Sequence, residues 1–120
     1  MSCRDCCGCP KFIKSCSIRN ESNGDVHVYV SYKKLGSDLG DSEGHQYDVA
    51  IPQGETHRVE HRIVKHDLAD YNSQIHKIDV TLVNGNQLHV EEPFDGVREI
   101  QNDWLFVIND QSIKSLPAEN

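Results

Sequence analysis

The middle of the chain alternates apolar and polar residues with a period of two. In VHVYVSY (residues 26–32) every second residue is Val or Tyr, and the intervening residues are His, Tyr and Ser. YDVAI (47–51) and IDVTLV (78–83) show the same alternation, whereas WLFVI (104–108) is apolar at every position. Alternation predicts strands with one buried face, and a short run that is apolar throughout predicts a strand buried on both faces.

Turn signals separate these segments. Asn84-Gly85 precedes NQLHV (86–90) and supplies the backbone freedom of a tight hairpin turn. NESNGD (20–25) predicts a second turn, which joins residues 26–32 to a strand ending near Ile18. About seven short strands in roughly 90 residues predict an all-β fold, an antiparallel β-sandwich of an immunoglobulin-like or C2-like arrangement.

One stretch, THRVEHRIVKHDLADYNSQ (56–74), allows two interpretations. Its apolar residues fit either a strand through Val64 followed by a loop, or a helix. The β-branched residues and the preceding PQGE turn signal favour the strand, with one short helical turn near residues 67–71.

The chain divides into a cysteine-rich basic head (residues 1–17), a sandwich domain (18–109) and a polar tail (110–120). The net charge is −7 over 120 residues. Residues 1–19 contain four basic residues and one Asp, a local charge of +3, which leaves −10 for the remainder. An acidic domain excludes nucleic acid as an expected partner, because phosphate repels it. A basic head fits an anionic surface instead.

Four of the five cysteines lie in the first nine residues, at Cys3, Cys6, Cys7 and Cys9. No apolar run resembles a secretory signal or a membrane span, so we expect a cytoplasmic protein, in which clustered thiols bind metal or lipid more often than they form disulfides. In a first interpretation the head binds zinc or an iron–sulfur cluster. The ligand set would be Cys3, Cys6, Cys9 and Cys16.

The second and favoured interpretation is S-acylation (palmitoylation) of the head. Acylated cysteines occur in groups beside basic residues, and two anchoring signals hold a protein at a membrane where one does not. Lipid would be attached at Cys3, Cys6, Cys7 and Cys9, with Arg4, Lys11 and Lys14 contacting the membrane. In a third interpretation the terminal thiols cross-link neighbouring chains or have no specific role. Whatever the other four cysteines do, Cys16 alternates with Ile18 at the start of the first strand and is expected to pack as a small apolar residue.

The sandwich domain offers weaker candidates for chemistry. HRVEH (57–61) matches the H-x-x-E-H zinc-peptidase pattern, which requires a helix. On a strand the two histidines would be about 13 Å apart, so we expect a solvated surface there. Acidic loops give a less favoured calcium site, since calcium takes carboxylate oxygens from flexible loops. Its ligands would come from Asp38, Asp41, Asp67, Asp70 and Asp95.

The sequence therefore predicts a non-enzymatic binding or scaffolding domain, held at the cytoplasmic face of a membrane by its acylated head. Its partners would be the membrane surface and either another protein or further copies of itself, and this function needs no cofactor. The alternative is a structural or self-assembling protein whose cysteines bind zinc or an iron–sulfur cluster or cross-link chains.

Overall fold

The computed structural model describes residues 12–41 and 44–118 and contains ten strands and one short 3-10 helix there. The strands are β1 (Cys16–Asn20), β2 (Val26–Tyr32), β3 (His45–Ile51), β4 (Thr56–Val59), β5 (Arg62–His66), β6 (Ala69–Ser73), β7 (Ile75–Thr81), β8 (Gln87–Glu91), β9 (Trp104–Ile108) and β10 (Ile113–Pro117). The 3-10 helix η1 spans Ser37–Leu39. None of the described residues forms a helix long and apolar enough to cross a bilayer.

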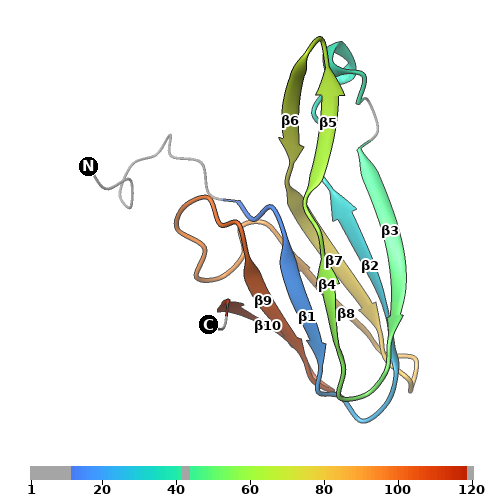
Figure 1. The fold of residues 1–120 in the computed structure, drawn as a ribbon. Helices are drawn as coiled ribbons and strands as arrows, with labels where there is room; N and C mark the ends of the chain where they lie inside the picture. The colour runs from blue at the N-terminus through green and yellow to red at the C-terminus, as the bar shows by residue number, and fades with distance from the viewer. Residues whose placement is uncertain (1–11, 42–43, 119–120) are drawn as a thin grey trace.

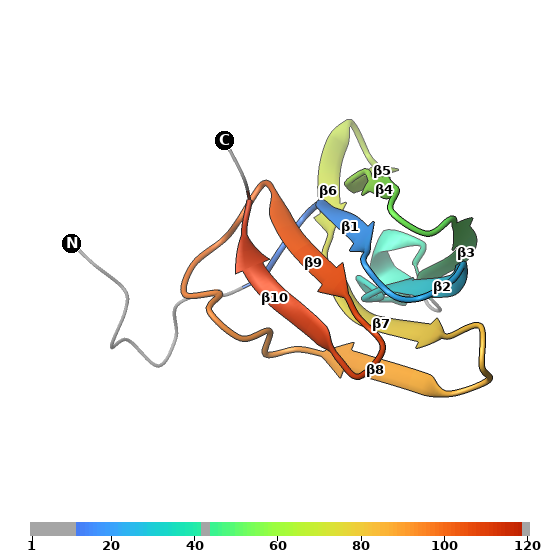
Figure 2. The ribbon, with the colours of Figure 1, turned by 90° about the horizontal axis from the view of Figure 1, so that it is seen from below.

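Eight strands form two four-stranded sheets that face each other (Figures 1 and 2). One sheet has the order β10-β9-β1-β4 and the other β3-β2-β7-β8. Every pairing is antiparallel except that of β1 with β9, which is parallel. The β-sandwich predicted from the alternation is confirmed, with one parallel pair added.

The core lies between the two sheets. All five residues of β9 are buried, as its uninterrupted apolar sequence predicts, because β9 lies between β10 and β1. On β2 the apolar residues Val26, Val28 and Val30 are at most 2% exposed. The ring centroids of Phe94 and Phe106 are 5.1 Å apart in an edge-to-face arrangement, which is favoured for aromatic pairs.

The predicted turn at residues 20–25 connects the two sheets. β1 and β2 belong to different sheets, so this turn is a crossover and not a hairpin. The fully buried Asn20 side chain organises it, donating to the carbonyls of Gly24 and Ile51 at 2.8 Å each. Its carbonyl oxygen accepts hydrogen bonds from the amide and hydroxyl of Ser22. A buried polar residue with every group paired fixes this connection.

The helical turn predicted near residues 67–71 is wrong. That segment is the end of a hairpin, in which β5 and β6 pair from Arg62↔Ser73 to His66↔Ala69. Asp67 and Leu68 form the two-residue turn, with φ of 49° and 65°. The hairpin lies between β4 and β7 in the chain. It projects beyond the two sheets of the sandwich (Figure 1). The short helical turn is at η1 instead.

Strand β10 lies within residues 110–120, for which the sequence predicts a polar tail. Its pattern is mostly exposed, since it is an edge strand, but Ile113 packs against the core. The Trp104 indole donates to the Ser115 hydroxyl at 2.8 Å, and that hydroxyl donates to the Asp95 carbonyl at 2.6 Å. These contacts join β10 to β9 and to the loop before it.

Candidate functional site

Cys16 is the one cysteine within the described residues. Cys16 begins β1, pairs with Val59 of β4 and is fully buried. Burial raises the pKa of its thiol well above the ordinary value, with a smaller opposing effect from Arg58. A buried, protonated thiol is a poor nucleophile and a poor metal ligand. Within the described residues Cys16 therefore serves as a packing residue.

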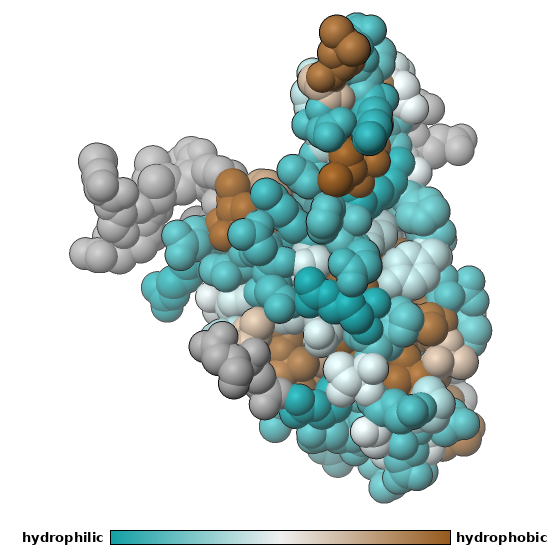
Figure 3. All heavy atoms as spheres, viewed as in Figure 1, coloured by the Kyte–Doolittle hydropathy of each residue, from teal (hydrophilic) through white to brown (hydrophobic). Residues whose placement is uncertain are grey.

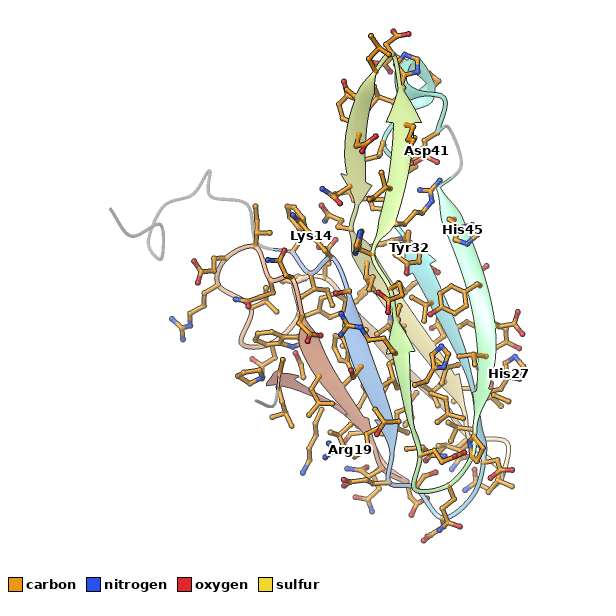
Figure 4. The ribbon with its side chains drawn as sticks, in the orientation of Figure 1. Lys14, Arg19, His27, Tyr32, Asp41 and His45 are labelled. Atoms are coloured by element: carbon orange, nitrogen blue, oxygen red, sulfur yellow. The ribbon has the colours of Figure 1, made fainter. Side chains whose placement is uncertain are left out.

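The remaining predicted head residues lie outside the described part of the chain, apart from Lys14. These are Cys3, Cys6, Cys7, Cys9, Arg4 and Lys11. Lys14 is half-buried just before β1, and its backbone amide donates to the Gln101 carbonyl at 2.9 Å. Ile13 beside it is fully buried and forms bridges to Ile75 and Gln101. The head is thus attached to a fixed point on the sandwich, near Lys14 in Figure 4.

A groove of about 400 Å³ opens where the edge strands β3 and β4 of the two sheets meet. Aromatic rings line it in series: the Tyr32 and His45 centroids are 5.9 Å apart, Tyr32 and Tyr47 6.3 Å, and Tyr47 and His57 6.5 Å. The strands place these residues, since Tyr32 ends β2, His45 and Tyr47 share one face of β3, and His57 lies on β4. Figure 4 shows Tyr32 and His45 close together there.

Charged residues line the remaining wall of this aromatic groove. Arg58 pairs with Asp103, and its Nε lies 3.5 Å from the Glu60 carboxylate. Arg62 donates to both carboxylate oxygens of Asp41, at 2.7 Å and 3.1 Å. Both guanidinium groups are therefore fixed in position by carboxylates, which favours a preformed surface over a mobile one.

The tyrosine hydroxyls of the groove stay protonated at neutral pH. Burial raises the pKa of Tyr47 to about 12, with smaller contributions from Cys16 and Glu60. Burial likewise raises the pKa of Tyr32, whose hydroxyl donates to the Glu60 carbonyl. Neither hydroxyl is activated as a nucleophile or base, so both act as hydrogen-bond donors on an apolar ring.

The H-x-x-E-H residues line the groove but do not have the peptidase arrangement. His57 is in β4, and Glu60 and His61 lie between β4 and β5, so no helix brings the histidines one turn apart. In residues 12–41 and 44–118, no three His, Cys, Asp or Glu side chains form a group that could hold a metal ion.

The five carboxylates proposed for calcium are not gathered into one site. Asp41 is buried against Arg62, and Asp38 lies in η1. Asp67 and Asp70 are in the β5–β6 hairpin, where Asp67 lies 3.2 Å from His66. Asp95 precedes β9 and accepts the Ser115 hydrogen bond through its carbonyl.

Histidines on the outer face of the β3-β2-β7-β8 sheet contact carboxylates. His27 lies 2.6 Å from Asp48, and the His89 ring lies 2.8 Å from Glu91 and 2.5 Å from Asp79. Glu91 first, and then Asp79, raise the pKa of His89. These side chains are more than one-third exposed, so His27 and His89 face solvent.

The sandwich of two four-stranded sheets resembles solved structures only weakly. No family model and no curated protein matches its sequence. One similar solved structure is Serratia marcescens Lip, a membrane-bound component of the type VI secretion system (9% identity, TM-score 0.44, covering 89% of this chain and 98% of that one). A second is a protein from Eubacterium rectale (12% identity, TM-score 0.42, covering 89% and 91%). At this level of similarity neither structure informs the function of this chain.

The sequence prediction missed the aromatic groove. The alternation places Tyr47 on the inward face of its strand. His45 is two residues earlier and therefore on the same face, so the sequence indicates an aromatic pair at the start of β3. The meeting of β3 with β4 was not visible, because strand order follows from tertiary packing and not from local alternation.

Proposed function

We propose that this chain is a non-enzymatic binding domain held at the cytoplasmic face of a membrane by acylation of Cys3, Cys6, Cys7 and Cys9. The observation that carries the proposal is the division of the cysteines. The thiol within the described sandwich is buried and inert, while the other four precede the sandwich among basic residues. A single acyl chain gives marginal, reversible binding, and several chains beside positive charge give a stable anchor.

The burial of Cys16 also supports lipid over a metal centre. The proposed metal set needs four thiolates, and Cys16 is its fourth member. Ligation would require this residue to leave its place in β1, where it pairs with Val59 and contributes to the core. If Cys16 stays in the core, the other three members of the set, Cys3, Cys6 and Cys9, would have to hold the metal without it.

The aromatic groove between β3 and β4 supports the binding part of the proposal. Tyrosine and arginine are enriched where proteins bind each other, and rigid rings lose little entropy on contact. Among the described strands β3 pairs only with β2, and β4 only with β1, so within this part of the chain each has an open edge that an extended segment of a partner can join. Tyr32, Tyr47 and His57 would contact the side chains of that segment.

The first experiment is an intact mass of the native protein before and after hydroxylamine. A mass raised by acyl increments and lowered by hydroxylamine supports the tether. A mass excess seen only under native, non-denaturing conditions would indicate a metal-loaded head instead. The bare chain mass in both states contradicts the tether.

A cell fractionation experiment tests which thiols matter. Replacing Cys3, Cys6, Cys7 and Cys9 by serine should move the protein from the membrane to the soluble fraction. The matched control is Cys16→Ala, which should stay at the membrane because that thiol is inaccessible in the folded domain. Equal release by both variants would contradict the proposal.

The groove is tested by chemical cross-linking at native membranes. Tyr47→Ala should abolish the cross-linked protein adduct, whereas Tyr29→Ala should leave it unchanged. Tyr29 is a matched control, because it is 38% exposed and faces outward on β2, away from the groove. Adducts of equal yield from both variants would exclude the groove as the binding site.

A further inference from the structure

A small opening lies beside the point where the head joins the sandwich. It has a volume of about 220 Å³, and Lys14, His61, Asn72 and Asn102 line it. One water molecule occupies ~30 Å³ in the liquid, so a five-atom anion such as phosphate fits. Among the lining residues, all described in the structure, none is a carboxylate.

The backbone holds these four residues in place. The Lys14 amide donates to Gln101, and the Gln101 amide donates to Phe12, at 2.9 Å each. The Ser15 hydroxyl donates to the Asn102 carbonyl, and Arg58 donates to the same hydroxyl at 2.9 Å. The opening is thus formed by fixed backbone on the side of Lys14 and Asn102.

The base of the hairpin completes the opening. Asn72 lies in β6 opposite Ile63, and His61 lies directly before β5. Both side chains are exposed, so a ligand can reach them from solvent. The site therefore joins three separate parts of the chain: the residues before β1, the loop before β9 and the β5–β6 hairpin.

Charge favours an anion in this opening, although the domain is acidic. The nearest carboxylates in sequence, Glu60 and Asp103, both pair with Arg58. No ion pair of Lys14 occurs within residues 12–41 and 44–118. An ammonium with amide and imidazole N–H groups around it suits phosphate, which lysine binds as a point charge.

We propose that Lys14, His61, Asn72 and Asn102 form a phosphate-binding site that contacts a phospholipid headgroup. Lys14 provides the charge, and the side-chain N–H groups of the other three donate hydrogen bonds to phosphate oxygens. The inference rests on the proposed tether only in choosing lipid as the source of the phosphate, since the acylated residues lie a few positions before Lys14. The site would orient the domain once the acyl chains have brought it to the bilayer.

The test uses the full, unacylated chain with its thiols reduced. Inorganic phosphate, and not acetate, should shift the NMR signals of the Asn72 and Asn102 side-chain amides. Phosphatidylcholine vesicles that contain phosphatidic acid should sediment the protein, whereas pure phosphatidylcholine vesicles should not. Lys14→Gln should weaken vesicle binding about fivefold, the share expected of one lysine at an anionic surface.

Lys114→Gln is the matched control, because Lys114 is an exposed lysine of β10 outside the opening. It should bind vesicles as the parent chain does, and Asn72→Ala, a second variant with its backbone in β6, should weaken binding. Absence of amide shifts with phosphate, or equal weakening by both lysine variants, overturns the proposal. Phosphate shifts without vesicle binding support the phosphate site and overturn its role as a headgroup contact. Because no acyl chain is present, none of these outcomes depends on the tether.

Discussion

The Asp41–Arg62 ion pair holds the β5–β6 hairpin to the segment between β2 and β3. Arg62 donates two hydrogen bonds to the carboxylate and a third to the Ser73 hydroxyl at 3.0 Å. The Leu35 amide donates to the same carboxylate at 2.8 Å. The Asp41 side chain is 5% exposed and that of Arg62 22%, so water screens the pair only in part.

Asp41→Asn keeps the size of the side chain and removes its charge. Breaking a fully buried pair costs about 3–5 kcal/mol, and a hydrogen bond to a charged group contributes about 1.5–3 kcal/mol. Because Arg62 is partly exposed, we expect the free energy of unfolding to fall by about 2–3 kcal/mol. Arg62→Met should have a similar effect, since it leaves the carboxylate unpaired.

Urea unfolding of both single variants and the double variant measures the pair directly. The double variant should lose less than the sum of the singles, with a coupling of about 2 kcal/mol. Hydrogen exchange should locate the loss in residues 62–73, since the pair fixes the hairpin to its neighbour. A loss below about 0.5 kcal/mol for Asp41→Asn, or additive losses, would refute this reasoning.

The contribution of the Asp41–Arg62 pair to stability should decrease at low pH. Hydrogen bonding from Arg62 lowers the pKa of Asp41 below its ordinary 3.8. A depressed native pKa stabilises the fold above the ordinary value, and that contribution is lost as the pH falls through the native pKa. The stability difference between the parent and Asp41→Asn should therefore shrink below about pH 4.

Three further predictions follow from single sites. In the native state Cys16 should resist alkylation that modifies accessible thiols, and it should react once urea unfolds the chain, as peptide mass analysis would show; native modification would mean that β1 opens. His89→Asn should lower stability most below pH 6.5, because the raised native pKa makes the contribution of His89 disappear as the pH rises through it; a constant loss from pH 5 to 9 in urea titrations would contradict this. Replacing Asp67-Leu68 by Asn-Gly should raise the free energy of unfolding by about 0.5–1 kcal/mol, because both positions have positive φ; a lower thermal midpoint would disprove it.

Local alternation was enough to predict most strands, and the reasons for the failures are physical. Burial on one face leaves a period of two in the sequence, as in β2, and burial on both faces leaves an uninterrupted apolar run, as in β9. The β5–β6 hairpin has neither signal, because it extends beyond the sandwich and both of its faces are largely exposed. Its turn also lacks glycine. Asp41 and Arg62 are 21 residues apart, so their pairing depends on tertiary structure that no local pattern records.

Because the β5–β6 hairpin projects into solvent, apolar side-chain surface is exposed at its outer end (Figure 3). Leu68 is fully exposed in the turn, whereas Ile63, which is 43% exposed, lies near the base of the hairpin. A two-stranded hairpin alone is marginally stable in water, so its attachment depends on the contacts at its base. These are the Arg62 network and the Ser73 hydroxyl, which donates to the Lys33 carbonyl at 2.7 Å.

Packing of Ile13 attaches the start of the described chain firmly to the core. Ile13 is fully buried and forms bridges to Ile75 of β7 in one sheet and to Gln101, which precedes β9 of the other sheet. Ile13→Ala should therefore cost about 2–5 kcal/mol of unfolding free energy in urea. Ile100→Ala is the matched control: Ile100 is 42% exposed, and the loss should stay within about 0.5 kcal/mol.

Equal losses for the two variants would mean that residues 12–15 do not pack as the structure shows. A tether on a fixed residue limits the orientations that the domain can take at a membrane, because the chain between Cys9 and Ile13 spans at most about 14 Å. When Cys9 is acylated, Lys14 would then stay within reach of the bilayer surface, which is the condition that a headgroup contact at Lys14 requires.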